Sequence, residues 1–228
     1  MQKMFVIITA FFFTLSVHAG KIDLKPFQEL DVIKKNSIVI TDAMLIDGLY
    51  FIKAERNGGP ITFFISQNKK VFIPAEGYNL PSMSKISFPI DPTILLGKED
   101  FSYGSGKKVI YAFTDPECPY CLKFEKKMAA VADKYTFKVF LFPLSFHKNA
   151  VAMSEWILDA KSDKEKAARL LKTANNDTSY KTAKTSAEHK AAVKKILEKN
   201  AAIGAKIGVR GTPSVFDSNM NSISWGEL

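Results

Sequence analysis

The chain has 228 residues, of which 46% are hydrophobic, 12% aromatic and 24% charged, and this composition excludes a disordered protein. The formal charge is +9, but the lysines are interleaved with acidic residues in the stretches 162–172 and 187–200, as on solvated helix faces. Stretch 181–199 has few aromatic residues to stack on bases, so we expect no nucleic-acid partner. The length fits one large domain or two modest ones.

Residues 1–19 have the pattern of a signal peptide. Lys3 precedes an apolar run from Phe5 to Val17, and Val17 and Ala19 fit a signal-peptidase site. The run is shorter than the ~20 residues that span a bilayer, although an uncleaved anchor or a core helix remains the alternative. We expect an exported, periplasmic protein, in an oxidising compartment where a cysteine pair can cycle as a disulfide.

Residues 20–80 are predicted to form a small N-terminal domain. A short helix is expected within 20–36, and strand-like runs at 48–55, 60–66 and 69–75 are separated by turn signals. They predict an antiparallel meander from Gly48 to Ala75. A unit of about 60 residues has a marginal core, so we expect it to pair with a second copy.

A linker is predicted at 81–105, where proline, glycine and serine are frequent, with one short helix near Pro92–Lys98. The second domain, 106–228, alternates between strand and helix patterns. Its expected strands are 107–115, 136–144, 211–218 and 221–226, and its expected helices are 118–135, 147–162, 163–174 and 186–208. This order predicts an α/β domain with helices on a mixed sheet.

The two cysteines of the chain, Cys118 and Cys121, flank Pro119 and Tyr120. The loop they close is too short for a structural staple, because disulfide stabilisation grows with loop length. A helix beginning at Cys118 places its sulfur beside unpaired backbone N–H groups, which favour the thiolate, although the adjacent charge of Glu117 opposes it. Cys121 lies one turn further and more buried, and is expected to keep its proton. One sulfur is then the nucleophile and the other the resolving thiol.

Two other interpretations of the pair are weaker. A zinc site needs further ligands, and His147 and His189 are isolated, so no metal and no cofactor are expected. An inert disulfide is the other alternative, but so short a loop gives it little stabilising effect. A second signal is Thr212-Pro213 before a strand-like run, where a cis bond at a turn and a trans proline at an edge strand are equally open. The cysteine pair upstream favours the cis bond.

The stretches "FTDPECPYCLKFEKKM", "FLFPLSFHKNAVAMSEWILDA" and "GVRGTPSVFDSNMN" resemble the thioredoxin fold of the DsbC/DsbG family. "DGLYFIKAERNGGPITFFISQNKKVFIPAEGYNL" resembles that family's N-terminal dimerisation domain, so the resemblance covers nearly all of 20–228. It implies an α+β and α/β architecture: a cystatin-like dimerisation domain, a linker, and a thioredoxin-fold catalytic domain with a helical insertion. It also implies a V-shaped periplasmic homodimer that reshuffles or reduces wrong disulfides and is kept reduced by a membrane donor resembling DsbD.

The resemblance assigns the catalytic roles to Cys118 and Cys121, and the cis-proline pair to Thr212 and Pro213. With Pro119 and Tyr120, which resemble the DsbG version of the motif, this pair is expected to bind substrate. Two departures are noted. The extra structural cysteine pair of some members is missing, and the sequence stops at "SWGEL", where the family continues with a further helix. We expect the face under that helix to be exposed or covered by another element.

Three functions follow as hypotheses. The first is a dimeric thiol-disulfide isomerase or reductase acting on misoxidised exported proteins. The second is a DsbA-like oxidase, since "CPYC" resembles oxidase motifs equally well; the N-terminal domain argues against it. The third is a dimeric chaperone or binding module for an export or conjugation apparatus, with the thiols incidental.

Overall fold

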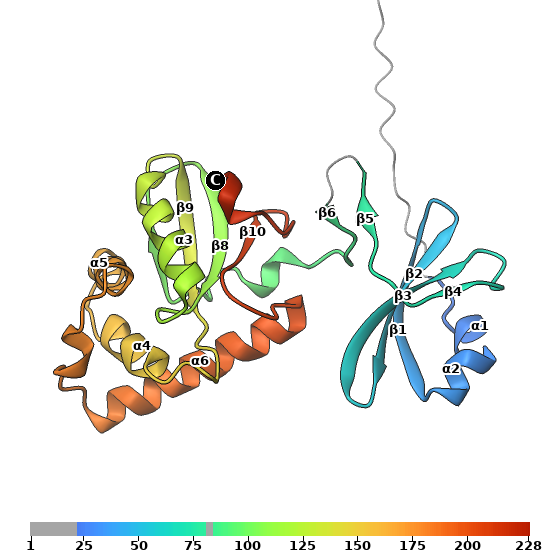
Figure 1. Cartoon of the computed structure of the whole chain (residues 1–228), viewed down its shortest axis with the longest axis horizontal. Helices are drawn as coiled ribbons and strands as arrows, with labels where there is room; N and C mark the ends of the chain where they lie inside the picture. Colours follow the sequence, from blue (N-terminus) through green and yellow to red (C-terminus); the bar gives the residue numbers. More distant parts are fainter. Residues whose placement is uncertain (1–21, 81–83) are drawn as a thin grey trace, which may run out of the picture. The chain divides into compact units, whose positions relative to one another are not determined.

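The computed structural model describes residues 22–80 and 84–228, which fall into two compact units that meet in the sequence at Phe88/Pro89. Figure 1 shows their elements along the chain. The predicted signal peptide, residues 1–19, lies outside the described residues. In the part of the chain that is described, no helix is long and apolar enough to cross a bilayer.

The N-terminal unit is an antiparallel meander with two short helices. Its elements are α1 (Lys25–Gln28), α2 (Asp31–Lys35), β1 (Ile38–Ile46), β2 (Leu49–Arg56), β3 (Gly59–Ser66) and β4 (Phe72–Ile73), with the strands in the order β1-β2-β3-β4. Both long hairpins turn on two residues with positive φ, Asp47-Gly48 at 44° and 80° and Asn57-Gly58 at 52° and 75°. Such two-residue turns match the twist of the paired strands, which is why Asp-Gly and Asn-Gly occur here.

One face of this sheet and the two helices enclose a core. It consists of Phe27, Ile33, Ile38, Ile40, Ala43, Ile52, Ala54, Phe63 and Ile65. Strand β1 was not among the predicted strands, because Thr41-Asp42 interrupts its apolar alternation. The pairing with β2 shifts between Ile40 and Asp42, and this bulge returns Ala43 to the buried face.

The prediction of a linker at 81–105 is wrong at both ends. β6 (Ser84–Lys85) pairs with β5 (Tyr78–Asn79) in the N-terminal unit, and β7 (Phe101–Tyr103) is an edge strand of the C-terminal sheet. The expected helix is a single 3₁₀ turn, Pro92–Ile94. Leu95 and Phe101 are buried, yet no local period marks them, because their partners are distant strands and helices.

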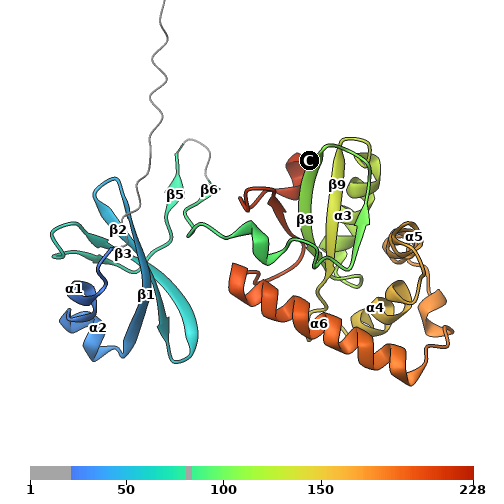
Figure 2. The same cartoon turned by 180° about the vertical axis from the view of Figure 1, so that it is seen from behind.

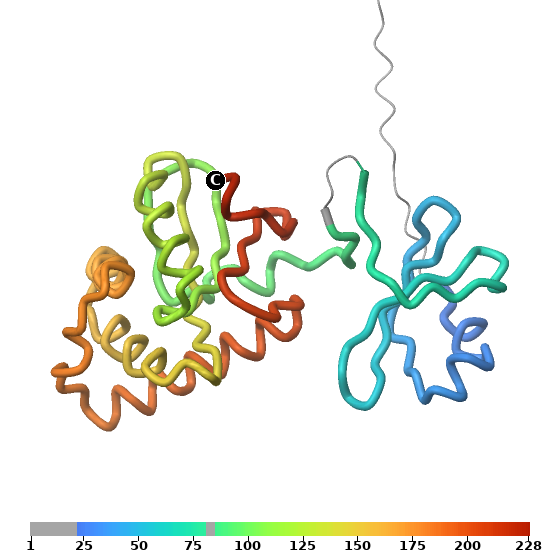
Figure 3. The backbone as a smooth tube through the Cα atoms, viewed as in Figure 1, coloured from blue at the N-terminus to red at the C-terminus, as the bar shows by residue number. Residues whose placement is uncertain are grey.

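The C-terminal unit has the mixed sheet that the sequence predicts, with strand order β10-β8-β9-β7. β8 (Lys108–Thr114) and β9 (Tyr135–Leu141) run parallel and are joined by α3 (Pro119–Ala130), while β7 and β10 (Ser214–Asp217) are antiparallel edges. Three helices lie between β9 and β10 in the chain: α4 (Ala150–Leu158), α5 (Asp163–Ala174) and α6 (Ala187–Ile207). Figure 3 follows this helical insertion from β9 to the red C-terminal segment. The predicted fold class is confirmed.

The central strands bury both faces. Ile110 and Ala112 of β8 pack in the cluster that contains Phe124 of α3 and Leu170 of α5. Tyr111 and Phe113 point the other way, into a cluster with Ile203 and Ile207 of α6. This alternation is the two-residue period of a strand covered on both sides, and Figure 2 shows the long α6 from behind.

The strand predicted at 221–226 does not form. A single bridge joins Phe216 to Ser222, and the described chain then turns into the 3₁₀-helix Trp225–Glu227. The side chain of Asp217 accepts hydrogen bonds from the backbone N–H groups of Asn219 and Asn221, which closes the preceding turn too tightly for a second long strand. Ile223, Trp225 and Leu228 pack against the cluster on the α3 side and cover part of that face.

The Asn57-Gly58 turn gives a stability test. Gly58→Ala should lower the free energy of unfolding by about 1–2 kcal/mol, because an alanine is strained at this positive φ. A Cβ there would meet no atom within 4 Å, so no clash adds to the cost. Gly59→Ala is the matched control: its Cβ would lie 3.6 Å from the Arg56 oxygen with no positive φ, so its effect should be near zero. Denaturant unfolding followed by far-UV circular dichroism measures both, and equal effects would contradict the turn assignment.

Candidate active site

Cys118 lies where β8 gives way to α3. The strand ends at Thr114, the segment Asp115-Pro116-Glu117 turns, and Cys118 is the N-cap of the helix, with extended φ and ψ of −71° and 124°. The Cys118 N–H donates to the Asp115 carbonyl at 3.0 Å. Pro119 is the first helical residue, where a missing N–H costs nothing. The predicted position of Cys118 at the start of the helix is confirmed.

Cys121 lies one turn further along α3 and is fully buried, whereas Cys118 is 5% exposed. The Cys121 sulfur accepts a hydrogen bond from the Asp115 N–H at 3.3 Å. Burial raises the pKa of the Cys121 thiol far above its ordinary value, although this bond and threonine side chains act in the opposite direction. Both cysteines are free thiols. Cys121 therefore keeps its proton, as the sequence predicts.

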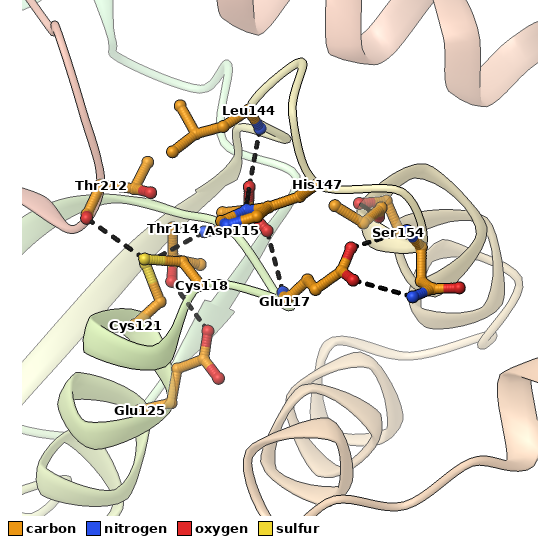
Figure 4. Close-up of polar contacts among 12 residues, drawn as sticks. Thr114, Asp115, Glu117, Cys118, Cys121, Glu125, Leu144, His147, Ser154 and Thr212 are labelled. Atoms are coloured by element: carbon orange, nitrogen blue, oxygen red, sulfur yellow. Dashed lines mark hydrogen bonds and ion pairs between the residues drawn. The ribbon is translucent and has the colours of Figure 1, made fainter.

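The loop before β10 meets the start of α3. The Cys118 sulfur lies 3.6 Å from the Thr212 carbonyl oxygen, and the Thr212–Pro213 peptide bond is cis, as predicted. Figure 4 shows Thr212 facing the sulfur. Thr212 and Pro213 are half-buried, while Pro119 and Tyr120 are exposed, Tyr120 to 65%. The structure thus brings two segments 94 positions apart to one sulfur.

Glu125 is a buried acid below the cysteine pair that the sequence analysis missed. Its Oε1 accepts the Thr114 hydroxyl at 2.7 Å, and within the described residues its Oε2 has no partner. Burial raises the pKa of Glu125 well above its ordinary value, and the nearby Asp115 and Cys118 raise it further. Burial therefore favours the neutral form of this carboxyl. Its place four residues after Cys121 on α3, beside the buried Phe124, is the signal that could have identified it.

Two carboxylates of the segment before Cys118 reach the loop that precedes α4. Asp115, fully buried, accepts the Leu144 N–H at 2.6 Å and His147 Nδ1 at 2.8 Å. Glu117 accepts the N–H and the Nδ2 of Asn149 at 2.6 and 2.8 Å (Figure 4).

Partial burial acts against ionisation of Glu117, but the bonds from Asn149 outweigh it and its pKa is lowered. From the sequence alone, the Glu117 charge is expected only to oppose the thiolate. The structure turns that charge toward the N-terminus of α4, a favourable place for an anion.

Within the described residues, no three His, Cys, Asp or Glu side chains are grouped so that they could hold a metal ion. His147 contacts Asp115, and His189 Nε2 lies 2.9 Å from the Glu155 carbonyl.

A Cys-x-x-Cys pair at the start of a helix, facing a cis proline on a mixed sheet, defines a thiol-disulfide oxidoreductase of the thioredoxin fold.

Comparison with known families agrees with this class. The sequence model of the thioredoxin-like domain matches residues 102–221, more than half of the chain, and the chain belongs to the thioredoxin-like family.

Several solved structures are similar at low identity. Helicobacter pylori DsbG is 15% identical, with a TM-score of 0.45, and the match covers 82% of this chain and 97% of that one. A putative protein-disulfide isomerase from Pseudomonas syringae is 16% identical, with 57% and 93% covered and a TM-score of 0.46. Proteus mirabilis ScsC in a compact conformation is 18% identical, with 56% and 68% covered and a TM-score of 0.42. The comparison with curated proteins gives no match.

Glu125 predicts a pH-dependent stability. Its folded-state pKa lies above the unfolded value, so its neutral form contributes fully below about pH 4, and that contribution is lost as the pH rises toward the folded pKa. In Glu125→Gln the loss is absent. The unfolding free energy of the variant, relative to wild type, should rise by more than about 1 kcal/mol between pH 5 and pH 9.

The measurement is denaturant unfolding followed by fluorescence of Trp156 and Trp225, which both lie in the C-terminal unit. Glu198→Gln, at an exposed residue of α6, is the control and should leave the pH dependence of wild type unchanged. If the unfolding free energies of wild type and Glu125→Gln depend on pH in the same way, the pH dependence does not come from Glu125.

Proposed function

We propose that the protein is a periplasmic thiol-disulfide isomerase or reductase of the DsbC/DsbG type, active as a homodimer on misoxidised exported proteins. The observation that carries the proposal is the asymmetry of the two sulfurs. Cys118 lies at the helix start, 3.6 Å from the Thr212 carbonyl, whereas Cys121 is fully buried and held as a thiol. This asymmetry supports Cys118 as the sulfur that reacts with a partner and Cys121 as the one that reacts only with Cys118.

The first step is exchange at Cys118. Its thiolate attacks one sulfur of a substrate disulfide, a bond forms between Cys118 and that sulfur, and the other substrate sulfur leaves as a thiolate. The unpaired N–H groups at the start of α3 stabilise the attacking anion. Pro119 and Tyr120 on the exposed side, with Thr212 and Pro213 opposite, form the surface against which the substrate backbone lies.

The second step has two outcomes. A different substrate thiolate attacks the mixed disulfide, which releases Cys118 and leaves a rearranged substrate; this is isomerisation. Alternatively, Cys121 loses its proton and attacks the Cys118 sulfur, which releases a reduced substrate and leaves a Cys118–Cys121 disulfide. The reductive branch needs a dithiol donor to restore both thiols, and a membrane protein resembling DsbD fits that chemistry. No metal or organic cofactor takes part in either branch.

Dimerisation through the N-terminal unit is supported by the edge of its sheet. The side-chain amide of Gln28 donates to the Ile38 oxygen at 2.8 Å and accepts from the Ile40 N–H at 2.9 Å. It therefore covers the start of β1. Beyond the bulge, β1 continues to Ile46 as an edge strand with Leu45 49% exposed. An exposed apolar edge strand is suited to pairing with a second copy.

The cysteines give the direct test of function. Reactivation of a scrambled multi-disulfide protein should be catalysed by wild type and should fall to the rate of glutathione alone in Cys118→Ala. Cys121→Ala should retain rearrangement while mixed disulfides accumulate, because the resolving thiol is missing. Wild type without reactivation above glutathione alone would reject the proposal. An equilibrium with glutathione that strongly favours the dithiol form, in a monomeric protein, would favour the oxidase.

The edge strand gives a test of the dimer. Leu45→Lys should weaken self-association about tenfold or more, since a charge replaces apolar area at the proposed interface. Val71→Lys is the matched control, because Val71 is 51% exposed and lies outside β1. Sedimentation equilibrium measures both variants and wild type. A monomeric wild type, or equal weakening by the two substitutions, would reject the β1 interface.

A further inference from the structure

The pair formed by Asp115 and His147 links the cysteines to the loop before α4. Asp115 Oδ2 lies 2.8 Å from His147 Nδ1, and the two residues are 32 positions apart in the chain. The Asp115 side chain is fully buried and that of His147 is 16% exposed. Phe146, 71% exposed, contacts the imidazole edge-on at 4.6 Å between centroids. The ring is therefore held in one orientation, with its Nδ1 toward a buried carboxylate.

The main chain of Asp115 touches both cysteines. Its N–H donates to the Cys121 sulfur at 3.3 Å, and its carbonyl accepts the Cys118 N–H at 3.0 Å. Its carboxylate also accepts the Leu144 and Glu117 N–H groups at 2.6 and 2.8 Å. In general, hydrogen bonds donated to a carboxylate favour its charged form. The carboxylate thus belongs to the residue whose main chain contacts both cysteines.

We propose that His147 is a positioning residue that couples the nucleophile to pH: its imidazolium form compensates the Asp115 charge and favours the Cys118 thiolate. The Nδ1–H is donated to Asp115 in both protonation states, so the geometry persists while the charge changes. Loss of the Nε2 proton to solvent leaves the Asp115 charge uncompensated, and the thiolate is then less favoured. The inference rests on the proposed role of Cys118 as nucleophile. Histidine is suited to this role because it ordinarily titrates between pH 5 and 8.

The surrounding ionisable groups fit such a coupling. Glu117, in the same segment as Asp115, interacts electrostatically with His147. Glu125 of α3 interacts with both Asp115 and Cys118. On the His147 loop the exposed Lys148 follows, and the first turn of α4 carries no acidic residue. The charged groups that contact the imidazole or interact with it electrostatically are thus mainly acidic.

The first test is the rate of alkylation of the reduced full-length protein by iodoacetamide from pH 5 to pH 9. His147→Asn can keep an N–H donor toward Asp115 but cannot ionise. At pH 5.5 its Cys118 should react about three- to tenfold more slowly than that of wild type. The reason is that a change of one unit in the pKa of a thiol changes its thiolate fraction about tenfold. The two rates should converge at pH 9. His189→Asn, the same change at a histidine that contacts the Glu155 carbonyl instead, should follow wild type throughout.

A second measurement needs no variant at His147. Coupling is reciprocal, so oxidation of the cysteine pair, which removes the thiolate, must shift the titration of the imidazole. Ring-proton NMR should give a higher His147 midpoint in the reduced protein than in the disulfide form. The chain has three histidines, and His189→Asn supports the assignment.

Superimposable alkylation profiles for wild type and His147→Asn, or equal midpoints in the two redox states, would overturn the inference. If wild type catalyses disulfide exchange while either result is obtained, the inference alone fails. If wild type has no exchange activity, the proposed function fails, and the NMR titration still reports whether His147 and the cysteines are coupled.

Discussion

The burial of β8 on both faces is the constraint on which the site depends. Ile110 and Ala112 point into one cluster and Tyr111 and Phe113 into the other, so a slip of one residue would exchange the two sets. This fixes where the strand ends, at Thr114, and hence where Asp115 and the start of α3 lie. The Cys118 sulfur is placed at the sheet end by packing several residues away from it.

The two buried acids beside the cysteines show how local bonding decides the state of a carboxyl group. Asp115 accepts hydrogen bonds from two backbone N–H groups and contacts the Nδ1 atom of His147. Among the described residues the Glu125 carboxyl has one hydrogen-bond partner, the Thr114 hydroxyl, and burial raises its pKa. Two acids in adjacent elements thus serve different purposes. Asp115 ties the turn before Cys118 to the loop that precedes α4, and Glu125 lies one turn beyond Cys121 on α3, where burial favours its neutral form.

Sequence reasoning succeeded where an element carries its own pattern. β8, α3 and α6 have complete apolar periods, and the Asn57-Gly58 turn has its own residue signature. It failed for β1, whose bulge breaks the period, and for β7, whose three residues are too few to have one. The strand expected at 221–226 failed because the Asp217 turn, and not strand propensity, directs the chain there.

By itself the sequence determined the chemistry: two thiols three positions apart at the start of a helix, where helix electrostatics apply whatever the fold. Family resemblance assigned Thr212 and Pro213 to the cis-proline pair, but the 3.6 Å between the Cys118 sulfur and the Thr212 carbonyl oxygen comes from the folded chain alone. The contacts of Asp115 with His147 and of Glu125 with Thr114 were decided by tertiary structure alone. Local patterns encode where a helix begins, but the neighbours of a buried charge come from segments that only packing brings together.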